Sequence, residues 1–577
     1  MKDEIQKIFE GDIDDSAETL SKYSHDASLF EIRPQMVLFP KHSKDIQNLV
    51  LWVKENKNKY PNLSITARCA GTCMSGGSIN NSIIIDFTKY MNKVISIGKS
   101  EREIMKPLFT SSREVEITGY AVTQPGVFYR DFEPQTFEKG LLLPCYTASK
   151  SLNALGGMVG NNSGGELTLR YGKTEDYISE LKVVFSDGHE YSVRPITRRE
   201  LYQKIAEPTF EGKVYKEMFD LIAEHEEQIK NAKPKVTKNS AGYYLWNVLR
   251  RGETEAEDIF DLAKLMVGSQ GTLGIITEIR WKLVEKIEKS KLLVLFLNDF
   301  KKIGEIVDEL LVTDPISIES YDDKTFWLAV KFFRDFVKNK GFWSTVRFGL
   351  EFLPEVFMTL RGGVPKLIIL SEYAGKSEQE INSKAQKAYR VMKKFGLKMR
   401  VTKSSQEAEK YWTMRRDSFA LLRKHVAGKR TAPFIDDVIV RSEFLHDFLP
   451  KINALIQEYP NLVYTIAGHA ENGNFHIIPL VDPNDPKLPD TVIELSKRVY
   501  DLVLFYEGSI DAEHNDGIVR TPYLNQMYGD SIYALFKKTK SIFDPLNIFN
   551  PGKKVGGTLD NLRDTLIQPH RDMKHSS

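Results

Sequence analysis

The chain has 577 residues, of which 41% are hydrophobic and 27% charged, and its formal net charge at pH 7 is +2. This length predicts more than one domain, because single hydrophobic cores stop growing near about 250–300 residues. The balanced charge argues against a nucleic-acid partner, and no apolar run approaches the roughly 20 residues that a membrane span needs. Three cysteines without a C-x-x-C pair argue against an iron–sulfur domain or a disulfide framework and favour a cytoplasmic location.

The predicted elements change character along the chain. The first 30 residues predict a short acidic helix and a loop, and apolar residues at helical spacing predict a helix over residues 44–57. Short strand-like runs separated by glycine-rich turns then continue to about residue 285. After that point the pattern predicts longer helices and a second set of strands, beginning with a buried strand at residues 292–297.

Four glycine-rich loops stand out in the first half of the chain, at residues 67–78, 124–126, 155–165 and 267–276. Loops of small residues let backbone N–H groups approach phosphate oxygens closely. Ordinary turns explain each loop equally well on composition alone. Four of them on one β-rich scaffold suggest a long cofactor that carries phosphate.

A predicted hairpin lies in the second half, where Asn472-Gly473 separates two strand-like runs. If these two residues form the turn, His469 faces His476 on the neighbouring strand, and two imidazoles so placed can share one metal ion. A polar surface hairpin with two idle histidines is the alternative. The pair in register, together with Glu513-His514 downstream, favours the metal site.

These motifs resemble the FAD-binding domain of the vanillyl-alcohol oxidase/p-cresol methylhydroxylase (PCMH) superfamily. Residues 68–77 resemble its pyrophosphate loop, R-x-x-G-T-x-x-x-G-G, and residues 144–172 resemble the segment along the flavin and the ribityl chain. Residues 268–277 resemble G-S-E-G-T-L-G-I-I-T, with Gln270 in place of Glu. Residues 543–552 resemble the C-terminal motif F-D-P-x-x-x-x-N-P-G-K.

Within that superfamily the chain is most similar to the FAD-linked D-2-hydroxy-acid dehydrogenases, over about residues 23–553. The resemblance implies an α+β fold with a PCMH-type FAD-binding domain at residues 1–285 and an α/β substrate-binding cap domain at residues 286–505, which carries the metal hairpin. A C-terminal segment, residues 506–577, is expected to complete the active site.

The resemblance implies that FAD is bound non-covalently, because Thr72 stands where members with covalent flavin carry a histidine. Cys69 and Cys73 replace the more usual Gly or Ser and are expected to pack beside the cofactor. The implied FAD-binding residues are Arg68, Ala70, Gly71, Thr72, Cys73, Ser75, Gly76, Gly77, Pro144, Ser149, Gly156, Gly157, Gly160, Asn161, Asn162, Ser163, Gly164, Gly172, Gly271, Gly274, Ile275, Ile276 and Asn550.

The family's metal signature, G-H-x-G-D-G-N-x-H, resembles the hairpin, with the dipeptide at residues 471–472 replacing Gly-Asp. By this resemblance His469, His476 and Glu513 are ligands of a divalent metal, and His514 is the catalytic base. Two nitrogens and one carboxylate suit zinc, with manganese and iron as alternatives.

The substrate carboxylate needs a cation, preferably a guanidinium that can bind it through two hydrogen bonds. The family places an arginine in W-x-x-R, which here is Arg415, with the adjacent Arg416 as the second choice. A surface salt bridge is the structural alternative for either residue. Asn474, between the two metal histidines, is a further candidate for contact with the substrate.

The resemblance implies oxidation of a D-2-hydroxy acid to the 2-oxo acid, with D-lactate as the first candidate and D-2-hydroxyglutarate and glycolate behind it. Electrons are expected to leave to a quinone, a cytochrome, an electron-transfer flavoprotein or a separate iron–sulfur subunit. Two rivals are an FAD-dependent alkyl transferase on the same fold and a non-catalytic flavoprotein subunit. The complete set of metal and base residues argues against the second rival.

Residues 324–366 interleave aromatic and basic side chains. Such a stretch can lie in a membrane interface. The slightly favoured alternative is a pair of cap helices that bury the aromatic residues and expose the lysines. Peripheral contact with the inner face of the membrane through this stretch is therefore the second expectation beside a cytoplasmic location.

Overall fold

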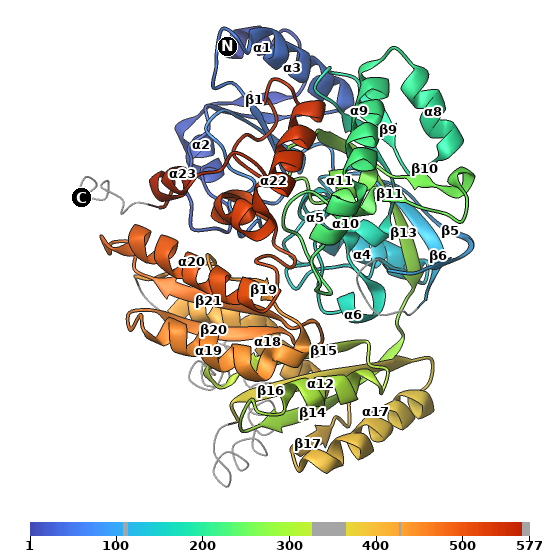
Figure 1. Ribbon diagram of the computed structural model, residues 1–577, viewed down its shortest axis with the longest axis vertical. Coiled ribbons are helices and arrows are strands. Elements are labelled where there is room, and N and C mark those ends of the chain that lie inside the picture. The colour runs from blue at the N-terminus through green and yellow to red at the C-terminus, as the bar shows by residue number, and fades with distance from the viewer. Residues whose placement is uncertain (108–113, 326–364, 426–427, 568–577) are drawn as a thin grey trace.

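The computed structural model describes residues 1–107, 114–325, 365–425 and 428–567 (Figure 1). The basic aromatic stretch falls almost entirely outside these ranges, so its contact with a membrane stays a prediction. Within them, no helix combines the length and the apolar composition needed to cross a membrane.

The N-terminal part begins with a four-stranded sheet, in the order β1-β2-β4-β3, in which β2, β4 and β3 run parallel. Its strands are β1 (Asp12–Asp14), β2 (Met36–Phe39), β3 (Ile65–Arg68) and β4 (Ile83–Asp86), and its helices are α1 (Lys2–Ile5), α2 (Ala17–Tyr23) and α3 (Ser43–Asn56). The predicted helix over residues 44–57 is confirmed as α3. Its apolar face, including Ile46, Leu49 and Val53, packs on Ile83 and Ile85 of β4.

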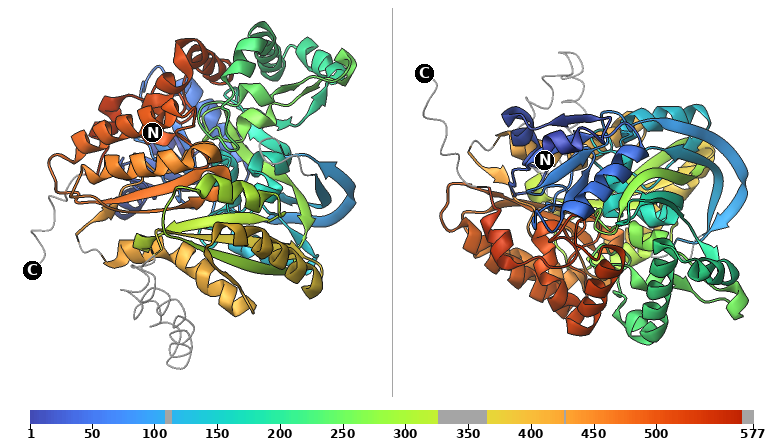
Figure 2. Two further views of the ribbon diagram at one scale, coloured as in Figure 1. Left: turned by 60° about the horizontal axis from the view of Figure 1, so that its bottom comes forward. Right: turned by 90° about the horizontal axis from the view of Figure 1, so that it is seen from above.

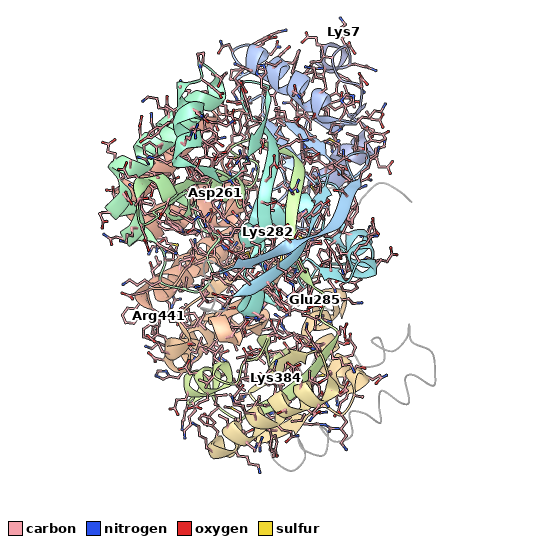
Figure 3. All side chains as sticks on the ribbon, turned by 90° about the vertical axis from the view of Figure 1, so that its right-hand side faces the viewer. Lys7, Asp261, Lys282, Glu285, Lys384 and Arg441 are labelled. Carbon is pink, nitrogen blue, oxygen red and sulfur yellow. The ribbon has the colours of Figure 1, made fainter. Side chains whose placement is uncertain are left out.

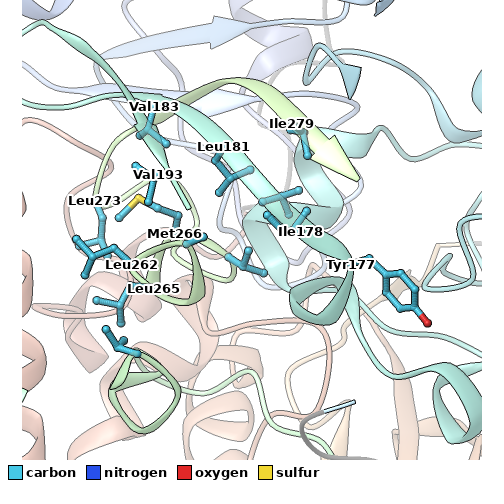
Figure 4. Close-up of a cluster of buried hydrophobic side chains, with 14 of the residues drawn as sticks. Tyr177, Ile178, Leu181, Val183, Val193, Leu262, Leu265, Met266, Leu273 and Ile279 are labelled. Carbon is cyan, nitrogen blue, oxygen red and sulfur yellow. The ribbon is translucent and has the colours of Figure 1, made fainter. Parts of the chain in front are cut away.

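A second sheet in this part has six strands among the described residues, all antiparallel, with β13 near its centre. The strands are β5 (Val94–Met105), β6 (Val115–Thr123), β7 (Leu141–Leu142), β8 (Ile178–Val184), β9 (Glu190–Val193) and β13 (Ile275–Glu285), with α4 (Tyr129–Glu138), α6 (Thr168–Tyr171), α7 (Thr174–Tyr177) and α11 (Ala263–Met266) beside them. Figure 4 shows part of the core between this sheet and α11, formed by Leu181, Val183, Val193, Leu262, Leu265, Met266 and Leu273.

The prediction of short strands up to residue 285 is wrong for residues 198–232, which are mostly helical. This region contains α8 (Arg198–Ala206), α9 (Phe210–Glu224) and α10 (Glu226–Ala232). A small sheet flanks it in sequence, with β10 (Ile196–Thr197) before the helices and β11 (Leu249–Arg250) and β12 (Ile259–Phe260) after them. The helical period was present in the sequence: α9 buries Val214, Met218, Leu221 and Ile222 on one face.

The middle part is built on an eight-stranded sheet among the described residues, in the order β17-β14-β16-β15-β20-β21-β18, with β19 also paired to β21. Its strands are β14 (Lys289–Leu297), β15 (Ser317–Asp322), β16 (Leu367–Gly375), β17 (Lys398–Val401), β18 (Arg430–Thr431), β19 (Val438–Ile439), β20 (Val463–His469) and β21 (Asn474–Val481). Its helices are α12 (Ile303–Leu311), α17 (Glu378–Met392), α18 (Ser405–His425), α19 (Leu445–Gln457) and α20 (Leu488–Phe505). Figure 2 shows helices stacked on this sheet, beside the N-terminal part.

The strand predicted at residues 292–297 is confirmed as β14, and the structure explains its unbroken apolar run. Leu293 and Leu295 face the core that contains α12 and α17. Leu292 and Val294 face the opposite way, onto Trp412 and its neighbours in α18. A strand covered on both faces needs apolar residues at every position.

The hairpin exists, but its predicted register is wrong. The connection spans residues 470–473, with a turn of 3₁₀ helix at Ala470–Asn472, and His469 pairs with Asn474, whereas His476 pairs with Ala467. Gly473 takes a φ of +69°, and a Cβ there would lie 1.9 Å from the carbonyl oxygen of Val440. Close packing of the turn against the segment after β19 therefore selects the longer loop.

The C-terminal segment contacts both parts of the molecule. After α21 (Gly517–Arg520), the helix α22 (Leu524–Phe543) lies beside α9 and α10, and Phe536 and Phe543 join the core of the second sheet. The short α23 (Leu559–Asp564) packs near α20 and α21. Figure 3 shows Lys282 and Glu285 near the end of β13, from which the chain enters the middle part that carries Lys384.

Candidate active site

One cavity of about 750 Å³ lies between the N-terminal and middle parts. Its N-terminal wall consists of the glycine-rich loops, and its opposite wall carries arginine and histidine side chains from α18, β20 and β21. Glu513 and His514 of the C-terminal segment close one end of it. The three predicted regions of the chain thus meet at a single cavity.

The loop after β3 forms part of the N-terminal wall, and its shape depends on glycine. Gly71 and Gly76 have φ of +67° and +80°, which side chains other than glycine rarely adopt. Asn550 fixes this loop from outside the cavity: its amide donates to the carbonyls of Gly77, at 2.8 Å, and Gln270, at 2.7 Å. One C-terminal side chain therefore holds two of the predicted cofactor loops together.

The segment predicted as a loop at residues 155–165 begins instead with a helix, α5 (Leu155–Asn161). Leu155, Met158 and Val159 share one buried face, which outweighs the low helix propensity of the glycines. On the other face, a Cβ added at Gly157 or Gly160 would meet no atom within 4 Å. The helix therefore exposes bare backbone to the cavity, as a closely fitting planar or phosphate-bearing ligand requires.

Most of the predicted FAD-binding residues line this cavity, namely Arg68, Ala70, Gly71, Thr72, Cys73, Gly77, Ser149, Gly156, Gly157, Gly160, Asn161, Ser163, Gly164, Gly271, Gly274 and Ile276. The others lie behind the lining, namely Ser75, Gly76, Pro144, Asn162, Gly172, Ile275 and Asn550. Asn162, for example, ends α5 with a φ of +53° and binds Glu175. The bare glycine face and the hydroxyl and amide groups around it fit a cofactor such as FAD.

The three predicted metal ligands meet at the far wall. His469, His476 and Glu513 each offer a ligand atom, and these atoms lie within 4.8 Å of one another. His469 Nε2 is 3.1 Å from Glu513 Oε1. The two histidines are diagonal rather than opposed across the hairpin, yet their rings are 5.4 Å apart between centroids, so the changed register preserves their proximity.

A carboxylate behind His469 orients its ring. Glu319 of β15 pairs directly with His469 across the sheet, and its Oε1 is 2.5 Å from His469 Nδ1. Burial alone would raise the pKa of Glu319, but Arg415 and His469 lower it to about 2, and Glu319 in turn raises the pKa of His469 to about 9 against the effect of burial. The Nδ1 atom is engaged, so Nε2 is the atom directed at the metal position, an arrangement common around protein metals.

Asp436 orients two further histidine rings in the same way, those of His476 and His514. Its carboxylate is 3.3 Å from His476 Nδ1 and 2.7 Å from His514 Nδ1. Burial alone would lower the pKa of His514, but Asp437 and Asp436 raise it to about 9. With Nδ1–H donated to Asp436, His514 has Nε2 as the nitrogen that can receive a proton.

The backbone that carries Glu513 and His514 is held by buried charges. Asp437 has a φ of +63°, and its Oδ2 accepts the N–H groups of Ala512, Glu513 and His514 at 3.1, 2.7 and 2.7 Å. The buried Arg520 donates to three backbone carbonyls, those of Asp436, Ile510 and Asn515. Neither residue belongs to a motif that the sequence analysis recognised.

Both candidate arginines line the cavity, and each also forms an ion pair with a carboxylate. Arg415 donates through Nε to Glu319 Oε2 at 2.8 Å, whereas Arg416 forms a two-point pair with Glu166, at 2.6 and 3.2 Å. Asn474 does not line the cavity, and its amide donates to Asp437 Oδ1 at 2.9 Å. Its contact with substrate stays a prediction, and the structure assigns it a supporting contact.

Two charged residues that lie behind the lining, next to the predicted metal ligands, were not singled out from the sequence. Lys238 is fully buried, and its Nζ lies 2.5 Å from Glu513 Oε1. Burial alone would raise the pKa of Glu513, but Lys238 and His469 hold it well below its usual value. Glu471, noted in the sequence only as a departure from the signature, is buried, and burial and Glu319 raise its pKa to about 8.

Comparison with known families assigns both parts of the chain. The FAD binding domain family matches residues 34–194, and the C-terminal domain of the FAD linked oxidases matches residues 286–554. Among solved structures, p-cresol methylhydroxylase with substrate bound superposes with a TM-score of 0.62 at 17% identity, over 95% of this chain and 94% of that one.

Curated relatives are similar over almost the whole chain. The D-2-hydroxyglutarate dehydrogenase of Pantoea ananatis is 26% identical over 94% of this chain and 50% of its own length. The glycolate oxidase subunit GlcD of Bacillus subtilis is 25% identical over 94% of this chain and 93% of its own. The D-lactate dehydrogenase of Anaerostipes hadrus is 25% identical over 92% of each chain.

The chain spans about half the length of the first of these relatives and of three others with the same name. The two family matches lie on the two parts that enclose the cavity, and the superposition confirms the predicted PCMH-type fold. Residues 34–194 belong to the FAD binding domain family, and residues 286–554 belong to the C-terminal domain family of the FAD linked oxidases.

Proposed function

We propose that the chain oxidises a D-2-hydroxy acid to the 2-oxo acid with non-covalently bound FAD and a divalent metal. One observation carries the proposal: the predicted ligands His469, His476 and Glu513 lie beside His514 in the cavity that the glycine-rich loops also line. D-Lactate is the first substrate candidate. The names of the relatives place D-2-hydroxyglutarate and glycolate beside it.

The loops around Gly71, α5 and Gly271 would hold FAD, which when bound accepts the hydride from the substrate Cα. His469, His476 and Glu513 would hold the metal, with zinc favoured and manganese or iron as alternatives. A divalent metal there would polarise the substrate hydroxyl. Two nitrogens and one carboxylate leave a coordination position for substrate, as catalytic sites do.

The side chains around this position divide the remaining work. Arg415, anchored on Glu319, would bind the substrate carboxylate and orient the Cα hydrogen toward the flavin. His514 would take the hydroxyl proton at Nε2, because Asp436 holds Nδ1. Asp437 and Asp436 raise the pKa of His514 to about 9, so the neutral ring that can take this proton becomes the main form only above that pH.

Electrons would leave the reduced flavin to a non-oxygen acceptor: a quinone, a cytochrome, an electron-transfer flavoprotein or a separate iron–sulfur subunit. We infer a cytoplasmic protein, and contact through residues 324–366 is the route by which it would reach a membrane acceptor.

Anaerobic bleaching of the flavin absorbance near about 450 nm tests the proposal, because an oxidised flavin that accepts a hydride loses this band. D-Lactate, L-lactate, glycolate and D-2-hydroxyglutarate would be compared before and after chelation. We expect bleaching by a D-acid or glycolate, loss of bleaching on chelation, and recovery when metal is returned. No bleaching by any acid, with FAD and metal bound, would contradict the proposal and favour the non-redox alkyl transferase.

A further inference from the structure

A buried ammonium group shares a carboxylate with the proposed metal site. Lys238 lies in the segment between α10 and the strand β11, is 0% exposed, and approaches Glu513 Oε1 at 2.5 Å. The same oxygen is 3.1 Å from His469 Nε2 and belongs to the proposed ligand set. An ammonium and a divalent cation at one carboxylate repel each other strongly in a buried site.

A second carboxylate nearby has no hydrogen-bond partner among the described residues. Glu471 is 4% exposed, and neither of its side-chain oxygens is hydrogen-bonded there. It lies close to the same histidine, since Glu319, His469 and Glu471 offer atoms within 4.8 Å of one another. A buried carboxylate without a partner is unfavourable as an anion, so Glu471 is expected to carry its charge only in a state of the protein in which a cation reaches it.

A third carboxylate of this group, that of Glu319, is already occupied. Glu319 uses Oε1 for His469 and Oε2 for Arg415. Glu471 is therefore the acceptor available to the ammonium group if Glu513 is engaged elsewhere. Lysine suits such a movement, because its charge sits on a flexible four-carbon stem.

We propose that Lys238 moves from Glu513 to Glu471 when Glu513 binds the metal, so that the pair Lys238–Glu471 sets the metal affinity of the site. The hydrogen bond from Lys238 Nζ to Glu513 Oε1 breaks and one to a Glu471 carboxylate oxygen forms, and any proton on Glu471 passes to solvent. Both are positioning residues. The inference rests on the proposed metal site, and it gives a function to the glutamate that replaces glycine in the metal signature.

Metal affinity tests this inference directly. The FAD-loaded full chain would be stripped of metal, and zinc binding would be measured by competition with a coloured chelator. We expect Glu471→Gln to weaken zinc binding about tenfold, because Lys238 then stays on Glu513. Lys238→Met removes the competitor and should bind zinc at least as tightly as the wild type.

The double variant shows whether Glu471 acts on the metal through Lys238 or directly, because non-additive effects report coupling between two residues. In the Lys238→Met background, Glu471→Gln should change zinc affinity less than about twofold. An equal loss in both backgrounds would show that Glu471 acts on the metal itself and would overturn the inference, as would no loss in either. Lys238→Gln replaces Lys238→Met if the latter does not fold.

One matched control completes the design. Lys264→Met removes another buried lysine, which donates to the carbonyl of Glu175, and should leave zinc affinity unchanged. The assay does not depend on turnover. Non-additive effects of the Lys238 and Glu471 substitutions on zinc affinity, without flavin bleaching by any acid, would support this inference and contradict the proposed oxidation. A wild-type chain that binds no zinc, manganese or iron would overturn the inference.

Discussion

The two walls of the cavity are built in opposite ways. The N-terminal wall uses backbone, supplied by glycines such as Gly157 and Gly160, and its shape is set within short stretches of chain. The opposite wall uses ionisable side chains from distant segments, each fixed by another charged group, as Glu319 fixes His469 and Asp436 fixes His514. Added side-chain volume should therefore impair binding at the first wall, whereas loss of a charged or ionisable group should impair the second wall.

The largest expected effect is on the charged wall. His514→Ala should lower the rate of anaerobic flavin reduction by about 10²–10⁴-fold, the usual contribution of a general base. FAD should remain bound, because the substitution removes only the imidazole and keeps the backbone carbonyl of His514 to which Ser75 donates, and the flavin spectrum of the purified variant reports this. His446→Ala, at an exposed position, is the matched control. An unchanged reduction rate would remove His514 from the mechanism.

The corresponding change on the backbone wall is Gly160→Val. No atom lies within 4 Å of a Cβ at this position, so the chain should fold while the added methyl groups occupy cofactor space. We expect most of the FAD to be lost on gel filtration, with Gly160→Ala retaining more, as measured by the flavin to protein absorbance ratio. Full FAD content in Gly160→Val would show that α5 does not face the cofactor.

The support beneath the charged wall should matter for stability. Asp437→Ala leaves the N–H groups of Glu513 and His514 without their acceptor, and each unsatisfied group costs roughly 1–3 kcal/mol. We expect a loss of about 3 kcal/mol or more in the free energy of unfolding, measured in denaturant. Asp447→Ala, which removes a surface ion pair, should change the free energy of unfolding much less.

The smallest expected effect is a pH dependence of the chelated protein. Burial opposes ionisation of Glu319, but Arg415 and His469 lower its pKa to about 2, so its stabilising contribution is complete above the unfolded value near 4.5. This contribution should be lost as the pH falls from about 4.5 to 2. Thermal unfolding of wild type and Glu319→Gln should therefore differ most near neutral pH and converge in acid; a constant difference would contradict the assigned pKa.

The sequence by itself determined the elements and motifs that can be recognised within a short stretch of residues. A helical period predicts α3, an unbroken apolar run predicts β14, and glycine-rich stretches with short signatures identify the family fold and most of the residues that line the cavity. His469, His476, Glu513 and His514 were also recognisable, because their spacing follows a signature. The experiments above test whether each residue performs its predicted role.

Only the tertiary structure decided the features that depend on contacts across the chain. The hairpin register follows from the packing of Gly473 on Val440, and α5 is helical because its apolar face is buried, although its composition predicts a loop. Lys238 reaches Glu513 across 275 residues of sequence. Such pairs leave no periodic or motif signal, because burial and charge compensation are satisfied in space rather than along the chain.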